Sequence, residues 1–178
     1  MASYEELRQR HVAELASIFP EWVQRLRWPA ERLHEERQRR LRELLRVALA
    51  SSPWHRERLD GVDPETFTED DLPRLPAMTR DDLMANWDAI VTDRRLTLAL
   101  VERHLAGLTS DAYLFDEVHA IASGGSTGRR GVYVHGWRAW AEEWAGFMRP
   151  VLWDRATSRE LAALPSTVAM SPPSTPPT

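Results

Sequence analysis

Ala122-Ser123-Gly124-Gly125-Ser126-Thr127-Gly128-Arg129-Arg130-Gly131 is the segment on which the expected fold is built. It holds four of the eight glycines of the chain, three hydroxyl side chains and two adjacent arginines. Residues 113–121 before it have the composition of a strand. Residues 132–135 after it are β-branched and aromatic, which predicts a second short strand. The glycine-rich segment is therefore expected to connect two strands.

Two hypotheses explain the composition of this glycine-rich segment. Glycines let the backbone turn with positive φ and approach a ligand closely, and hydroxyls and exposed backbone N–H groups can bind phosphate oxygens. Arg129 and Arg130 can add charge-assisted hydrogen bonds to the same phosphates. The other hypothesis is a plain β-hairpin with a glycine-rich tip. Composition alone favours neither.

Two common nucleotide-binding motifs are excluded. A Walker loop ends in Gly-Lys-Ser/Thr, whereas all 23 basic residues of this chain are arginine. A dinucleotide fingerprint requires Gly-x-Gly-x-x-Gly between a strand and a helix. The spacing of Gly125, Gly128 and Gly131 does not supply that pattern.

The glycine-rich segment resembles the phosphate loop of adenylate-forming enzymes, the superfamily of acyl-CoA synthetases and luciferases. The pattern of that loop is Thr-Ser-Gly-Ser/Thr-Thr-Gly-x-Pro-Lys-Gly. Residues 125–128 match its central tetrad, and Ser123 stands at the first hydroxyl position. The sequence departs from the pattern at Gly124 in the Ser position, Arg130 in the Pro position and Gly131 in the Lys position.

A second stretch strengthens this resemblance. Residues 52–59 (SPWHRERL), 61–64 (GVDP) and 70–83 (DDLPRLPAMTRDDL) are similar to the N-terminal signature of the phenylacetate–coenzyme A ligase branch. These elements and the phosphate loop occur in the same order in that branch. Together they cover about residues 40 to 150 of this chain.

The resemblance implies a ligase that joins a carboxylate, expected to be aromatic, to coenzyme A. ATP and Mg²⁺ would first give an acyl-adenylate, and the thiol would then displace AMP. The cofactor-binding residues that it implies here are Ser123, Gly124, Gly125, Ser126, Thr127, Gly128 and Arg129. Because the chain has no lysine, the catalytic lysine of the family has no counterpart, and we expect no catalytic residue and no turnover.

The expected fold class is α/β, with helices first and then the opening strands and helices of a larger domain. Residues 1–50 would be N-terminal helices, residues 51–165 the start of an AMP-binding large domain, and residues 166–178 a disordered Ser/Pro/Thr tail. In the resembling family the sheet continues well past this length. A truncated chain is therefore expected, with uncovered apolar faces that promote self-association.

Hydrophobic periodicity and capping signals place the expected helices. The pattern Ser3-x-x-Glu6 starts the first helix, which Pro20 should interrupt. Further helices are expected at residues 21–28, 30–50, 79–87, 97–105 and from 137 to 153, with residues 51–78 mostly loop. The arginines and glutamates of residues 30–50 indicate a solvated, ion-paired face, although a basic helix can also contact RNA or phospholipid.

Composition limits the function classes. The chain has 178 residues, 43% hydrophobic and 28% charged, with no apolar run long enough to span a membrane and no signal segment. The net charge of −4 argues against nucleic-acid binding. Zero cysteines exclude thiol chemistry and are compatible with a cytoplasmic protein.

Other candidate residues are weaker. The six histidines include no His-Glu-x-x-His pattern, so no metal site is expected. His119 would face the nucleotide or acyl pocket, or would be a packed strand histidine. The tryptophan stripe that starts at Trp137 would line an acyl pocket or form core. A nucleotide-binding fragment without turnover and a helical interaction module are the other function classes.

Overall fold

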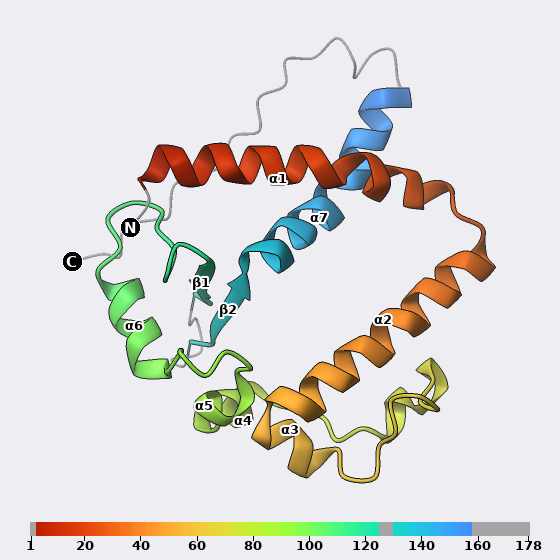
Figure 1. Cartoon of the computed structure of the whole chain (residues 1–178), viewed down its shortest axis with the longest axis vertical. Coiled ribbons are helices and arrows are strands. Elements are labelled where there is room, and N and C mark those ends of the chain that lie inside the picture. Colours follow the sequence, from red (N-terminus) through yellow and green to blue (C-terminus); the bar gives the residue numbers. More distant parts are fainter. Residues whose placement is uncertain (1–2, 125–129, 158–178) are drawn as a thin grey trace.

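The computed structural model describes residues 3–124 and 130–157 (Figure 1). The expected mixture of helices and strands is confirmed in its coarse form. The described chain is mostly helical and contains a two-stranded antiparallel sheet. The expected tail at residues 166–178 lies outside the described part of the chain.

Helix α1 (Tyr4–Gln24) starts at the predicted capping box. The Ser3 hydroxyl accepts a hydrogen bond from the Glu6 N–H, and the Glu6 carboxylate accepts one from the Ser3 N–H. The expectation that Pro20 interrupts this helix is wrong, because α1 passes through Pro20 before the short η1 (Arg25–Arg27). A proline inside a helix costs about 3 kcal/mol, so tertiary packing must offset that cost.

Packing against helix α7 (Trp137–Thr157) supplies this compensation. Ile18 and Trp22, on either side of the proline, pack against Ala141 and Ala145 of α7, and both alanines are fully buried. Figure 1 shows α7 crossing α1 obliquely, close to the C-terminal end of α1. Two small residues let the helix backbones approach closely, and the core interpretation of the tryptophan-rich helix is confirmed.

Helix α2 (Ala30–Ser51) agrees with the predicted helix. Glu36 pairs with Arg39 at 2.8 Å and with Arg40 at 2.7 Å, and these hydrogen bonds lower the pKa of Glu36 to about 2. The ion-paired face predicted from the sequence is therefore present. On the inner side, Leu45 packs with Leu59 and Phe67 in a cluster of their own.

The middle of the chain consists of short helices joined by loops, as expected. Thr79 and Asp82 form the predicted capping box, and the Thr97 side chain caps the next helix. The helix that was expected to reach Trp87 ends earlier, because Asn86 leaves the helical conformation and Trp87 starts a separate turn. The elements are α3 (Pro53–Arg58), η2 (Glu69–Arg74), α4 (Arg80–Ala85), α5 (Trp87–Ile90) and α6 (Leu98–Ala106).

Strands β1 (Val118–Ala122) and β2 (Val132–Gly136) form an antiparallel hairpin. Its register pairs Val118 with Gly136 and Ala122 with Val132. The expected strand pair on both sides of the glycine-rich segment is confirmed. This segment is the connection of a hairpin.

The expectation that the first strand begins at residue 113 is wrong, because a tight turn precedes Val118. Phe115 and Asp116 have φ values of 56° and 57°, which are unfavourable for non-glycine residues. The guanidinium of Arg10 donates a hydrogen bond to the Asp116 carbonyl at 2.8 Å, and the guanidinium of Arg95 lies over the Phe115 ring. These long-range contacts stabilise a turn that the local sequence does not predict.

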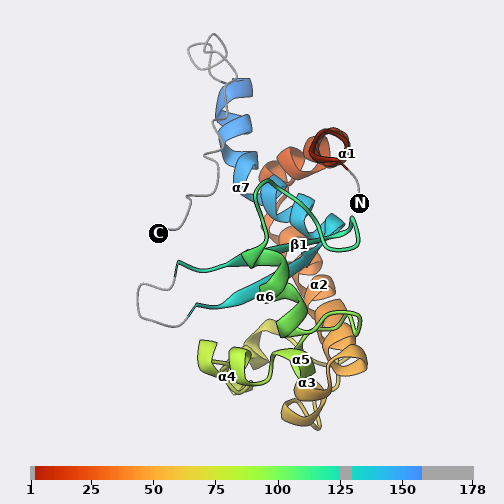
Figure 2. The same ribbon diagram turned by 90° about the vertical axis from the view of Figure 1, so that its left-hand side faces the viewer.

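One face of the hairpin packs on the short helices, and the other faces α7 (Figure 2). At the start of β2, the buried Trp87 indole N–H donates to the Val132 carbonyl at 3.0 Å. The Val132 N–H donates to the Met84 sulfur at 3.4 Å. Side chains of α4 and α5 therefore bond to the N–H and the carbonyl of Val132, next to the glycine-rich segment.

The Trp87 hydrogen bond makes a testable contribution to stability. In Trp87→Phe the buried Val132 carbonyl loses its donor and the core loses volume, so the free energy of unfolding should fall by about 1–3 kcal/mol. Chemical denaturation followed by circular dichroism measures this change. The matched control is Trp28→Phe at a half-buried position, and an equal effect at both sites would contradict the assignment.

Exposed apolar side chains predict self-association of the purified chain. Phe147 of α7 is 72% exposed, and Leu44 of α2 is 65% exposed. Sedimentation velocity of the unchanged chain should show concentration-dependent oligomers, and the double variant Leu44→Glu, Phe147→Glu should reduce them. A monodisperse monomer with a cooperative melt would refute this prediction.

Candidate functional site

The two ends of the glycine-rich segment are fastened to each other. The Ser123 N–H donates to the Gly131 carbonyl at 2.9 Å, and the Gly131 N–H donates to the Ser123 hydroxyl oxygen at 2.7 Å. A side chain at Gly131 would displace the phenol ring of the exposed Tyr133. Ser123 and Gly131 are therefore fixed relative to each other at the end of the hairpin.

The residues that the sequence assigned to phosphate binding divide into two groups. Ser123 and Gly124 follow β1, and the Ser123 hydroxyl closes the base of the hairpin. The others lie outside the described residues: Gly125, Ser126, Thr127, Gly128 and Arg129. The phosphate-loop hypothesis and the plain-hairpin hypothesis both predicted the strand–segment–strand arrangement, so the arrangement does not choose between them.

On the face toward α7, His119 of β1 lies directly opposite His135 of β2. The His119 ring stacks on the Trp140 ring, with centroids 4.0 Å apart and an interplanar angle of 17°. Burial lowers the pKa of His119 to about 4, and the nearby His135 and His11 act in the same direction. His119 is therefore the packed strand histidine of the two sequence hypotheses, and it is neutral near pH 7.

Tyr113 extends this aromatic cluster toward α1. It is buried, its hydroxyl lies 3.1 Å from His11 Nδ1, and its ring packs against the rings of His119 and Trp137. Burial and, to a lesser degree, the neighbouring Asp111 raise the pKa of the Tyr113 hydroxyl well above its usual value. Sequence reasoning missed this pairing, because 102 positions separate His11 from Tyr113 and no motif connects them.

Four buried ring nitrogens of the cluster have no hydrogen-bond partner within residues 3–124 and 130–157. They are His11 Nε2, His119 Nδ1, His135 Nε2 and Trp137 Nε1. An unpaired buried polar atom costs about 1–3 kcal/mol. Because these nitrogens are buried, they belong to the packed cluster and are not presented to solvent. Charge on the hairpin comes from the arginines of the connecting segment.

Metal binding by this cluster has no geometric support. Across the described ranges, no group of three or more histidine or acidic side chains is arranged to hold a metal ion. His135 Nδ1 lies 3.2 Å from a Glu143 carboxylate oxygen, and His119 Nε2 lies 3.9 Å from Asp111. Each of these contacts joins one histidine to one carboxylate, and the histidines do not converge on a common point.

A scan against models of protein families, a search of curated proteins and a search of solved structures each found no match to this chain. No helix within the described ranges is long and apolar enough to cross a membrane.

His119 should make stability depend on pH. Its pKa is about 4 in the folded chain against 6.5 when unperturbed, so the unfolded chain binds a proton first as pH falls. The stability that depends on neutral His119 is complete above pH 6.5 and is lost between pH 6.5 and 4. In His119→Phe, which keeps an aromatic ring on Trp140, the loss between pH 7 and 4.5 should shrink by about 2.5 kcal/mol.

Urea denaturation at several pH values measures this difference. The pKa values of His11 and His55 are also lowered by burial, so the variant should keep a residual slope of the same sign. The matched control is His34→Phe at an exposed position of α2. An unchanged pH dependence in His119→Phe would show that the buried imidazole does not resist protonation.

Proposed function

We propose that this chain is the N-terminal part of an ATP-dependent carboxylate–coenzyme A ligase and that residues 122–131 hold the β- and γ-phosphates of ATP. The observation that supports this proposal best is the anchoring of both ends of the segment. Ser123 and Gly131 bond to each other, and Val132 bonds to Trp87 and Met84. A phosphate-binding loop needs such fixed ends, because donors that are already positioned lose little freedom on binding.

The chemistry of the segment fits a triphosphate. Glycine lets backbone N–H groups come close to an anion, and Ser126 and Thr127 add hydroxyl donors. The Ser123 oxygen accepts the Gly131 N–H through a lone pair, so its own O–H remains available to donate to a phosphate oxygen. Arg129 and Arg130 add positive charge beside these donors.

The proposal assigns residues 51–165 to the start of an AMP-binding large domain. Within the described residues, the second stretch of the resemblance packs against the hairpin that carries the glycine-rich segment: Trp54 and Leu83 belong to the same apolar cluster as Ala120 and Val132. The complete enzyme would use ATP, Mg²⁺ and coenzyme A on a carboxylate substrate. The segment would contribute ground-state binding of the phosphates, and catalytic groups would come from outside this sequence.

Removal of the loop hydroxyls should weaken nucleotide binding. In the double variant Ser126→Ala, Thr127→Ala, each lost hydroxyl contact should cost about 1–3 kcal/mol, which corresponds to at least about a tenfold higher Kd for ATP. Isothermal titration calorimetry with Mg·ATP measures this change. The matched control is Ser17→Ala with Thr66→Ala, two hydroxyls that bond locally on other elements. Unchanged ATP affinity in the loop variant would support the plain hairpin.

The chain by itself should not form acyl-adenylates. The reaction requires a lysine at the carboxylate and α-phosphate, and all 23 basic residues are arginine, whose planar guanidinium places charge differently. Loss of one positioned donor typically costs about 10²–10³-fold in rate. Incubation with ATP, Mg²⁺ and aryl or alkyl carboxylates should release no pyrophosphate above background. Carboxylate-dependent release that copurifies with the protein would overturn this prediction.

A further inference from the structure

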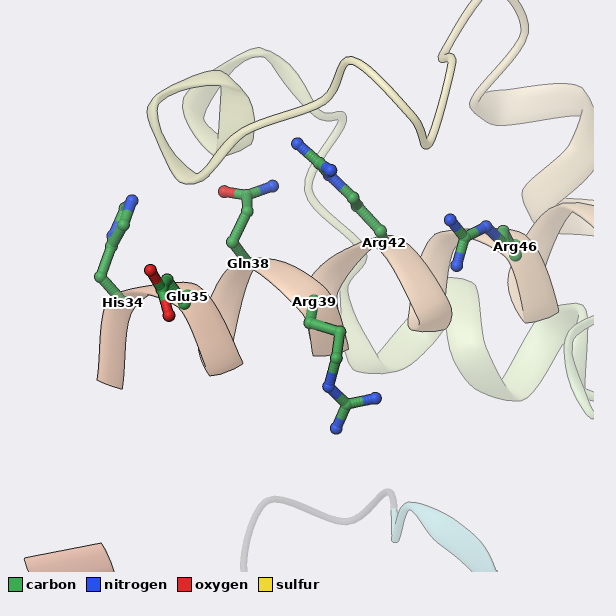
Figure 3. Close-up of a pocket in the computed structure, with 6 residues that line it drawn as sticks. All are labelled: His34, Glu35, Gln38, Arg39, Arg42 and Arg46. Carbon is green, nitrogen blue, oxygen red and sulfur yellow. The ribbon is translucent and has the colours of Figure 1, made fainter. Parts of the chain in front are cut away.

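The outer face of α2 carries a hollow that the phosphate-loop proposal does not involve (Figure 3). Its volume is about 420 Å³. Four of its residues are spaced by four positions and so share one face of the helix. They are His34, Gln38, Arg42 and Arg46. Figure 3 shows the side chains of His34, Gln38 and Arg42 pointing toward the neighbouring segment, and Arg39 pointing the opposite way.

The segment opposite α2 is held in place across this hollow. The Gln38 side-chain amide donates to the Phe67 carbonyl at 2.5 Å, and its oxygen accepts the Glu69 N–H at 3.2 Å. At the other end, the Arg46 guanidinium binds Glu65 with two hydrogen bonds of 2.7 and 2.8 Å. The rim is therefore formed by fixed contacts between two segments.

Arg42 lies between these fixed contacts without an anionic partner. Within the described ranges its guanidinium makes no ion pair or hydrogen bond, and its buried Nε lacks an acceptor. The two carboxylates of the opposite segment that bond to α2 are used by other arginines, because Glu65 binds Arg46 and Glu69 binds Arg37, each at 2.7 Å. A half-buried charge without a counterion is unfavourable, so an anion entering here would gain a charge-assisted hydrogen bond.

We propose that this hollow binds a small soluble oxyanion, of the class of phosphate or a phosphorylated metabolite. Arg42 supplies the positive charge and the donors, and His34 and Arg46 lie on either side. Glu35 also lines the hollow, and the net charge of the chain is −4, so an extended polyanion or an anionic membrane would meet repulsion.

The test is thermal unfolding in rising sodium phosphate, with sodium chloride adjusted to keep ionic strength constant. The Tm of the unchanged chain should rise with phosphate, because a ligand of the folded state stabilises it. In Arg42→Gln this rise should disappear, with phosphate affinity reduced at least about tenfold. Without phosphate the variant should be at least as stable as the unchanged chain, because an uncompensated charge is removed.

Two control variants and one direct measurement distinguish binding at this hollow from a general charge effect and from binding at the glycine-rich segment. Arg8→Gln on α1 changes the net charge equally and should keep the phosphate response. The Ser126→Ala, Thr127→Ala variant should also keep it, which distinguishes this hollow from the proposed ATP loop. Amide NMR of the unchanged chain should show phosphate-dependent shifts around Arg42, and this readout needs no variant to fold.

Three outcomes would overturn the proposal. The first is an equal response to phosphate and chloride at matched ionic strength. The second is an unchanged phosphate response in Arg42→Gln. The third is Arg42-dependent binding of phosphatidylserine vesicles or of an oligonucleotide without binding of inorganic phosphate, which would assign the face to a macromolecular polyanion instead.

Discussion

The buried hydrogen bond from Trp87 to the Val132 carbonyl fixes the relation between the helical half of the chain and the hairpin. β2 begins at Val132, so this bond and the Met84 contact satisfy backbone groups of an edge strand that no third described strand pairs. The apolar face of the hairpin then lies on α4, α5 and α6, and its opposite face is left for α7. The position of the glycine-rich segment follows from this arrangement.

The two faces of the hairpin have different chemistry, and the difference bears on the proposed function. One face is a dry aliphatic core with Val118, Ala120 and Val132. The other is an aromatic cluster that also holds three histidines, of which His119, stacked on Trp140, is uncharged near pH 7. Neither face supplies the positive charge that a nucleotide requires. Binding of phosphates would therefore depend on the donors of residues 122–131. The hairpin that carries them would contribute rigidity and little positive charge.

Local signals in the sequence predicted the local structure. The capping boxes at Ser3 and Thr79, the helix of residues 30–50 and the two strands were found because their causes lie within a few residues. The errors at Pro20 and at the turn of Phe115 have the opposite origin. α7 stabilises the helix beyond the proline, and Arg10 and Arg95 hold the turn, from distant parts of the chain.

In the candidate sites too, features with local causes could be predicted and features that depend on distant contacts could not. The sequence was sufficient to place the glycine-rich segment between two strands, but the hydrogen bonds between Ser123 and Gly131 emerge only from the structure. The partnership of His11 with Tyr113 and the unpaired state of Arg42 depend on contacts across the fold. No spacing rule in a single sequence contains that information, because alternating arginines and glutamates do not reveal which arginine is left without a carboxylate.

The separate cluster formed by Leu45, Leu59 and Phe67 has a dynamic consequence. It shares no buried residue with the cluster around Trp87 and Val132, so its contribution to stability is largely local. We expect the unit made of α2 and the segment opposite it to open more readily than the hairpin, as partial unfolding units do in other small proteins. Its amide hydrogens would then exchange with solvent before those of β1 and β2, and an oxyanion bound at Arg42 would slow that exchange without altering the hairpin.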